Sequence, residues 1–204
     1  MRIYRVMSAD QASAICDVLK SGEWQQGRAR TKELTGTVKQ NEEILKHETL
    51  DRIGKLVANN PAIQLDHIPL QVHSPKFSRY SIGAHYGRHT DAPWMGTTRT
   101  DLSCTLWLND DYEGGVLNIN GTRLKGQPGE CVIYDCGAPH EVEEVTAGER
   151  VCVITWIQSR IRDAHKRQLV SKMRKFLGKF EKTDHDLFVE GGQIHSALIR
   201  MWME

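Results

Sequence analysis

The chain has few of the features that mark membrane, secreted or nucleic-acid-binding proteins. Its 204 residues hold no run of 18 apolar side chains, so we expect no transmembrane helix. The first ten residues lack the continuous apolar core of a signal peptide, and none is expected. The formal net charge is only +1, which leaves no strong overall field to recruit nucleic acid or a membrane surface.

Cysteine is scarce as well. The five cysteines are odd in number and form no CxxC pair, which argues against a disulfide framework. Cys104, Cys131 and Cys152 lie in apolar stretches that are expected to be buried strands, so we interpret them as reduced packing residues. A reducing cytoplasm is the compartment that this pattern predicts.

Neither an internal repeat nor a low-complexity linker divides the chain, and its length suits one domain with a sizeable core. Ser8 and Gln11 have the spacing of a capping box, which predicts a helix up to about Lys20. Residues 23–40 hold few apolar side chains and several turn signals, so a hairpin or a mobile loop is expected there.

The middle of the chain is expected to be a series of short strands. A helix over about 42–59 precedes them, because its apolar residues recur at helical spacing and Pro61 would block extension. Beyond it, apolar runs alternate with turn signals up to about residue 158, which is typical of an antiparallel sandwich or jelly roll. The expected strands are 62–68, 76–82, 101–108, 116–119, 130–134, 141–145 and 150–157.

The C-terminal part is expected to be helical again. Residues 161–180 combine one apolar stripe with many lysines and arginines, and 193–203 predict a shorter closing helix. A cationic helix face can follow the phosphates of a nucleic acid, but the near-neutral net charge favours a solvated face. The apolar stripe either covers the main sheet or serves dimerisation, and the sequence leaves both readings open.

Three side chains have the composition of an iron site. Two histidines and one carboxylate on one face of iron(II) leave positions open for a cosubstrate and dioxygen, and His89, Asp91 and His140 supply that set. Side chains two residues apart on an extended backbone point the same way, so His89 and Asp91 can reach one ion. His140 follows Gly-Ala-Pro at the start of another expected strand, where a ligand at the rim of a barrel would lie.

An arginine ten residues after His140 is expected to point into the same barrel. If Arg150 faces inward, the alternation of a strand turns Cys152, Ile154 and Trp156 inward as well. An arginine in such a core is costly unless it meets an anion. That anion is either the far carboxylate of a keto-diacid such as 2-oxoglutarate, held through paired hydrogen bonds, or a fixed structural Asp or Glu.

Several further motifs occur in a fixed order around these residues. They are Trp24, 27–28 (GR), 38–41 (VKQN), 77–80 (FSRY), 86–91 (YGRHTD), 99–103 (RTDLS), 112–115 (YEGG) and 156–163 (WIQSRIRD). In this order they resemble the iron(II)- and 2-oxoglutarate-dependent dioxygenases of the prolyl 4-hydroxylase-like group, and most closely the bacterial PKHD-type hydroxylases. The resemblance extends over most of the chain.

The resemblance implies a fold that is mainly β with flanking helices. Its core would be a double-stranded β-helix, or jelly roll, with N-terminal helices packing on the sheet and a C-terminal helical extension. On this basis residues 1–158 form the dioxygenase domain, with the jelly-roll core over about 62–158. Residues 159–204 are then the helical extension of the same domain.

The resemblance also implies roles for individual residues. His89, Asp91 and His140 would be the iron ligands, Arg150 would anchor the far carboxylate of 2-oxoglutarate, and Tyr80 would contact the same cosubstrate. The implied reaction hydroxylates a C–H bond, most directly of a prolyl residue in a peptide or protein, and releases succinate and CO2. L-ascorbate is expected to help keep the iron reduced, as in similar enzymes.

Other readings stay open at this stage. A nucleic-acid or small-molecule oxygenase could use the same fold, and a jelly-roll binding module without activity is a further alternative. We expect a peptide or protein partner, no nucleic acid and no membrane, with a homodimer left open. Residues 23–40 could form a lid over the site, or their basic side chains could simply keep a loop solvated.

One position departs from the family pattern. Some prolyl hydroxylases share the far carboxylate with a tyrosine in the strand after the triad, and the corresponding residue here is Trp107, which has no hydroxyl. Thr105 or Ser103 on the same strand face, or a water molecule, could take its place. Asp91 is retained, which argues against the halogenase variant of this family, since that variant lacks the carboxylate.

Overall fold

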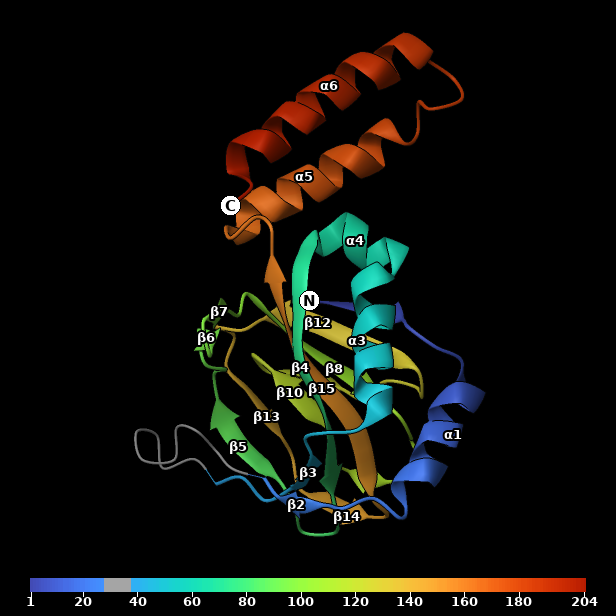
Figure 1. The fold of residues 1–204 in the computed structure, drawn as a ribbon, viewed down its shortest axis with the longest axis vertical. Helices are drawn as coiled ribbons and strands as arrows, with labels where there is room; N and C mark the ends of the chain where they lie inside the picture. The colour runs from blue at the N-terminus through green and yellow to red at the C-terminus, as the bar shows by residue number, and fades with distance from the viewer. Residues whose placement is uncertain (28–37) are drawn as a thin grey trace.

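Two antiparallel β-sheets face each other, with helices on the outer face of the larger sheet and a helical hairpin beyond one end (Figure 1). The structure, a computed structural model, describes residues 1–27 and 38–204. The larger sheet has the strand order β1 (Arg2–Arg5), β12 (Glu130–Asp135), β8 (Leu102–Trp107), β15 (Arg150–Ser159), β4 (Pro69–Tyr80), β3 (Glu42–Ile44) and β2 (Gln25–Gln26). This arrangement is the predicted jelly-roll architecture.

The smaller sheet and two short ribbons complete the β-structure of the described residues. The strand order of the smaller sheet is β11 (Thr122–Leu124), β10 (Leu117–Ile119), β13 (His140–Val142) and β5 (Tyr86–His89). The ribbons pair β14 (Val145–Ala147) with β9 (Glu113–Gly114), and β6 (Trp94–Met95) with β7 (Thr98–Arg99).

The two faces of strand β15 contribute to two different apolar cores, as the alternation of side chains along this strand predicts. Val151 and Val153 pack with the helices on the outer face of the larger sheet. Cys152 and Ile154 instead join the cluster that lies between the two sheets. Because side chains alternate along a strand, Arg150 belongs to the inner face, and the predicted inward orientation is confirmed.

The N-terminal helices cover the outer core. Helix α1 (Ala9–Leu19) begins with the predicted capping box, in which the side chain of Ser8 accepts from the backbone of Gln11 and the side chain of Gln11 accepts in return. Helices α3 (Glu48–Asn59) and α4 (Pro61–His67) follow. In the described part of the chain, no helix has both the length and the apolar character needed to cross a bilayer.

Two predictions around these helices were wrong. The helix expected over 42–59 begins only at Glu48, because residues 42–44 form strand β3 beside β4. The strand expected over 62–68 is helix α4. Pro61 occupies the first turn of α4, where its missing N–H costs nothing, and Asn60 caps the helix by accepting from two backbone amides.

Other boundaries also differ from those expected. Strand β4 begins at Pro69 rather than at residue 76, the stretch 141–145 is split between β13 and β14, and β1 and β5 were not predicted. The expected hairpin or lid over 23–40 contributes β2 and a β-bridge between Lys39 and Tyr86, while residues 28–37, with Arg28, Arg30 and Lys32, lie outside the described residues. All five cysteines are free, as predicted.

The C-terminal hairpin consists of α5 (Ala164–Leu177) and α6 (His185–Trp202), which is longer than the expected 193–203. Figure 1 shows the hairpin extending beyond the ends of the sheets, with α5 next to α4. Asp66 joins these elements, since its carboxylate accepts from Arg2, Tyr4, Ser171 and Lys175.

We expect Asp66→Asn to lower the free energy of unfolding by about 3 kcal/mol, because it removes the anion from a buried network. Burial by itself would raise the pKa of Asp66, but hydrogen bonds from Lys175, Ser171 and Arg2 outweigh it and hold the pKa well below its usual range. The contribution is therefore complete above about pH 4 and is lost as the pH falls below that value. Urea unfolding at neutral and acid pH measures both effects.

The matched control is Asp17→Asn, which breaks an exposed pair with Lys20 and should cost less than about 1 kcal/mol. Equal losses for the two variants would mean that the Asp66 network contributes no more than a surface ion pair.

Candidate active site

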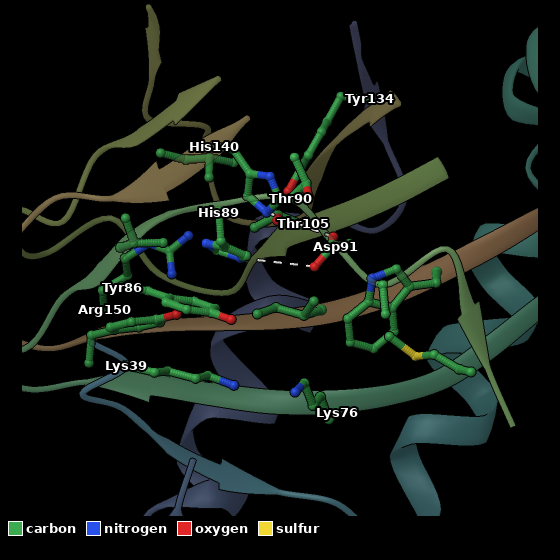
Figure 2. Close-up of a pocket in the computed structure, with 17 residues that line it drawn as sticks. Lys39, Lys76, Tyr86, His89, Thr90, Asp91, Thr105, Tyr134, His140 and Arg150 are labelled. Carbon is green, nitrogen blue, oxygen red and sulfur yellow. Dashed lines mark ion pairs between the residues drawn. The ribbon is translucent and has the colours of Figure 1, made fainter. Parts of the chain in front are cut away.

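The fold brings His89, Asp91 and His140 together at one end of the smaller sheet (Figure 2). His89 ends β5, His140 begins β13, and their Cα atoms are partners in the register of these two strands. One ligand atom from each of the three side chains lies within 4.8 Å of the others. The carboxylate oxygens of Asp91 are 3.9 Å from Nε2 of His89 and 3.7 Å from Nε2 of His140.

Both histidines are held in the orientation that a metal ligand needs. Nδ1 of His89 is 2.8 Å from the carbonyl oxygen of Gly87, and Nδ1 of His140 is 2.9 Å from that of Ala138. A proton on each Nδ1 satisfies these carbonyls and leaves each Nε2 lone pair for an ion. Burial, together with the neighbouring His140, lowers the pKa of His89 to about 4, so its ring is neutral at pH 7. The donor set therefore fits iron(II).

Asp91 is held by strand β8. The hydroxyl of Ser103 donates to Oδ2 of Asp91 at 2.5 Å, and the Asp91 amide donates to the carbonyl of Cys136 at 3.1 Å. Sequence reasoning considered Ser103 only as a substitute for a missing tyrosine. In the structure it orients the carboxylate of the triad instead.

We expect Ser103→Ala to weaken iron(II) binding by about 10- to 100-fold, the usual effect of losing a group that orients a metal ligand. Anaerobic competition with a chromophoric chelator measures this affinity. Ser21→Ala, at an exposed position after α1, is the matched control and should leave it unchanged. An unaltered affinity in Ser103→Ala would show that Asp91 keeps its position without this hydrogen bond.

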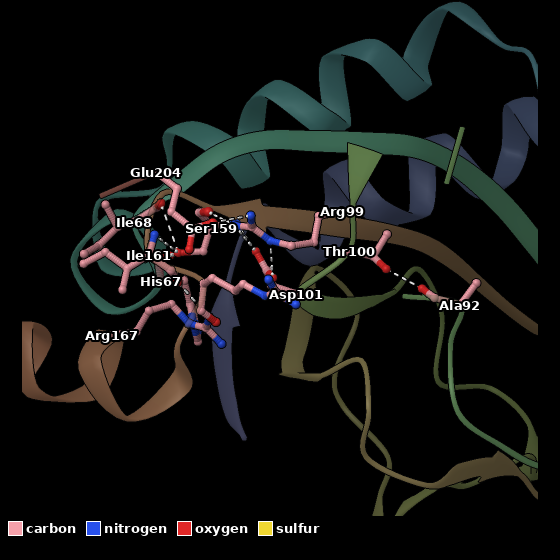
Figure 3. Close-up of polar contacts among 11 residues, drawn as sticks. His67, Ile68, Ala92, Arg99, Thr100, Asp101, Ser159, Ile161, Arg167 and Glu204 are labelled. Atoms are coloured by element: carbon pink, nitrogen blue, oxygen red, sulfur yellow. Dashed lines mark hydrogen bonds and ion pairs between the residues drawn. The ribbon is translucent and has the colours of Figure 1, made fainter. Parts of the chain in front are cut away.

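Polar contacts also fix the segment that follows Asp91 (Figure 3). The hydroxyl of Thr100 donates to the carbonyl of Ala92. Arg99 donates to Asp101 at 2.8 Å and to Glu204 at 2.7 Å, and Asp101 accepts from the amide of Ser159 at 2.8 Å. The triad segment is thereby tied to the end of β15 and to the end of the C-terminal hairpin.

A pocket that opens to solvent adjoins the triad, and its empty space, open mouth included, is about 780 Å³. The ring of Tyr86 stacks on that of His89, with 3.6 Å between ring centroids. Side chains from β4, β8, β12 and β15 form much of the remaining wall. Lys39, Lys76, Tyr86 and Tyr134 line this pocket and were not predicted as site residues.

Arg150 lines the same pocket, and its side chain is fully buried (Figure 2). Its Nη1 is 3.1 Å from Sγ of Cys152, whereas Nε and Nη2 have no hydrogen-bond partner in the described structure. No carboxylate among the described residues pairs with it, so the structural Asp or Glu considered above is not found there. A buried guanidinium with free donors is suited to the far carboxylate of 2-oxoglutarate.

Tyr80 and Trp107 accompany this arginine. Tyr80 pairs with Arg150 in the register of β4 and β15, and the guanidinium carbon lies 5.1 Å from the centre of its ring. Trp107 pairs with Cys152 across β8 and β15, and its Nε1 is buried without a partner. The position that lacks a tyrosine hydroxyl therefore still offers a free N–H donor. The hydroxyl of Tyr112 also has no hydrogen-bond partner in the described structure; burial raises the pKa of Tyr112, and the nearby Arg150 opposes that rise.

Comparison with known proteins supports the same class of chemistry. Residues 75–158 match the family described as the 2OG-Fe(II) oxygenase superfamily. A PKHD-type hydroxylase of Acinetobacter baumannii is 33% identical over 99% of this chain and 98% of its own length. Another, from Stenotrophomonas maltophilia, is 32% identical over 100% of this chain and 99% of its own length.

A solved structure shares the fold. A prolyl-4-hydroxylase of Pseudomonas putida superposes with a TM-score of 0.56 and 20% identity, covering 78% of this chain and 92% of its own. The two hydroxylases that align over nearly the whole chain show the family, and the superposition shows the fold. The chain therefore belongs to the PKHD-type hydroxylases, which makes it an iron(II)- and 2-oxoglutarate-dependent dioxygenase.

Proposed function

We propose that this dioxygenase hydroxylates a C–H bond of a prolyl residue in a peptide or protein, with release of succinate and CO2. One observation carries the chemistry: a His-Asp-His cluster lines the same pocket as a buried arginine that has no carboxylate partner among the described residues. The choice of a prolyl residue is supported by the resemblance to prolyl hydroxylases and by the fold shared with the Pseudomonas putida prolyl-4-hydroxylase.

The side chains of this pocket would divide the work between binding and orientation. His89, Asp91 and His140 would hold iron(II), which together with 2-oxoglutarate and dioxygen supplies the oxidant for C–H hydroxylation. Arg150 would hold the far carboxylate of 2-oxoglutarate, and Tyr80, its partner in the register of β4 and β15, would assist it. The protein thus contributes fixed ligands, a charged anchor and a shielded pocket.

Reductant and partners follow from the same proposal. L-ascorbate is expected to restore iron(II) after cycles in which 2-oxoglutarate is consumed but no substrate is hydroxylated. The substrate partner is a peptide or protein rather than a nucleic acid, and a homodimer is compatible with the exposed apolar residues of the C-terminal hairpin, which include Phe176 and Ile194.

The contacts made by the basic helix α5 argue against a nucleic-acid partner. Several of its cations have partners within the chain: Arg167 donates to backbone carbonyls, Lys175 pairs with Asp66, and Arg174 lies over the ring of Phe188. These contacts reduce the number of cations that could follow a phosphate backbone.

The test begins without a guess at the substrate. Iron(II) protein is reconstituted anaerobically with 2-oxoglutarate, oxygen is admitted, and succinate is measured beside a His89→Ala control. Proline-containing peptides are then added and hydroxyproline is sought by mass spectrometry. If succinate forms but no prolyl peptide is hydroxylated, the assignment as a dioxygenase is kept and the assignment of proline as its substrate is rejected.

A further inference from the structure

Two lysines that the dioxygenase chemistry does not use line the pocket beside the triad. Lys39 follows the segment outside the described residues and forms a β-bridge with Tyr86, and Lys76 lies on β4. Both Nζ atoms reach the same oxygen of Glu43 on β3, at 2.6 Å and 2.7 Å. The side chains of Lys39, Lys76 and Glu43 are only 5%, 17% and 7% exposed.

The two ammonium groups are held in fixed directions. Nζ of Lys39 lies 5.1 Å from the centre of the Tyr86 ring, and Nζ of Lys76 lies 5.3 Å from that of Trp156. In Figure 2 the two side chains approach each other from opposite sides, across the pocket from His89 and Asp91. Cations over aromatic rings and against one carboxylate are preorganised, so little side-chain entropy remains to be lost when a ligand binds.

The charges of the site do not balance. Among the described residues, the pocket and its direct partners hold three cations, Lys39, Lys76 and Arg150, and two carboxylates, Glu43 and Asp91. Iron(II) and the 2-oxoglutarate dianion would cancel each other, which leaves one positive charge uncompensated. Burial and the neighbouring Lys76 lower the pKa of Lys39, as expected for a cation that lacks a second anion.

We propose that Lys39 and Lys76 form a subsite for a carboxylate of the substrate. This proposal rests on the proposed function and adds the substrate class: an acidic molecule, anchored at the lysine pair opposite the triad. Glu43 positions both ammonium groups yet neutralises only one of them, so a second carboxylate completes the pairing. The carboxylate is either an Asp or Glu side chain near the hydroxylated residue or a free α-carboxylate.

Binding is tested without turnover, on anaerobic iron(II) enzyme saturated with 2-oxoglutarate so that the site at Arg150 is filled. Calorimetric titration uses four probes: N-acetyl-proline, its amide, and the amidated dipeptides acetyl-Glu-Pro and acetyl-Gln-Pro. At least one acidic probe should bind about tenfold more tightly than its neutral partner, which is the effect of one charge-assisted contact. The first pair tests an α-carboxylate and the second pair tests a side chain.

Variants assign the effect to the subsite. Lys76→Met should remove the preference for the acidic probe, and Glu43→Gln should increase it because the competing carboxylate is gone. Lys172→Met, on the exposed face of α5, should leave the preference unchanged. Equal binding of acidic and neutral probes, no binding of either acidic probe, or a preference that survives in Lys76→Met would each overturn the proposal.

Turnover separates this inference from the choice of proline. An enzyme that hydroxylates neutral prolyl peptides as well as acidic ones keeps the proposed function and loses the lysine subsite. An enzyme that binds acidic probes through Lys76 but hydroxylates no prolyl residue keeps the subsite and loses proline as the target.

Discussion

Asp91→Ala is expected to abolish succinate formation and hydroxylation, with a loss of at least about 10³-fold. Asp91 is the only carboxylate of the His-Asp-His cluster, and its removal leaves iron(II) with two neutral ligands. A 10³-fold loss of rate corresponds to about 4 kcal/mol of lost transition-state stabilisation, which is of the size that a metal site provides. Succinate yield and bound iron per chain should be measured together, because the loss arises at the metal.

The control for this variant is Asp186→Ala, which removes an exposed carboxylate in the first turn of α6. It should retain wild-type turnover. Wild-type succinate yield in Asp91→Ala would contradict the ligand assignment, even if iron remained bound, since the cluster would then be dispensable for the chemistry.

Arg150→Met is expected to raise the concentration of 2-oxoglutarate needed for half-maximal succinate formation by about 10²-fold. The reason is the loss of a buried, charge-assisted contact with the far carboxylate, for which truncation costs about 3 kcal/mol. Iron(II) affinity should stay unchanged, because Arg150 is not part of the cluster. Arg123→Met, which breaks an exposed pair with Glu143, is the matched control.

Stability supplies an independent readout of the same variant. Without 2-oxoglutarate, Arg150→Met should unfold at the same or a higher urea concentration than the wild type, because the native guanidinium is buried without an anionic partner. Adding 2-oxoglutarate should stabilise the wild type by mass action and the variant much less. A variant that loses stability without cosubstrate, while keeping its affinity for it, would make Arg150 a structural residue.

The sequence predicted the parts of the site that short-range rules control. The alternation of side chains along 150–157 placed Arg150 between the sheets, and the spacing of His89 and Asp91 placed both toward one point. The Gly-Ala-Pro turn before an expected strand pointed to His140, and the spacing of strands and turns predicted the jelly roll, which the strand order confirms. These features depend on neighbours in sequence or on motifs that stand close together in the chain.

The lysine subsite could not be predicted in the same way. Residues 42–44 fitted a helical pattern, and a helix would have separated Glu43 from β4. Lys76 was expected at the start of a strand over 76–82, but its burial depends on pairing of that strand with β15, far along the chain. The helix before Pro61 ends at Asn59 as predicted, but the strand expected after it was wrong, because a proline that ends one helix can also begin the next.

The ion pair between Arg99 and Glu204 joins the end of the C-terminal hairpin to the segment before β8. Arg99 lies in the segment between Asp91 and β8, so Glu204 contacts the stretch of chain that follows the His-Asp-His cluster. The deletion of α6 together with Glu204 would therefore remove a contact of this segment as well as the helix itself. The metal content of a form without α6 is the quantity to compare with that of residues 1–204.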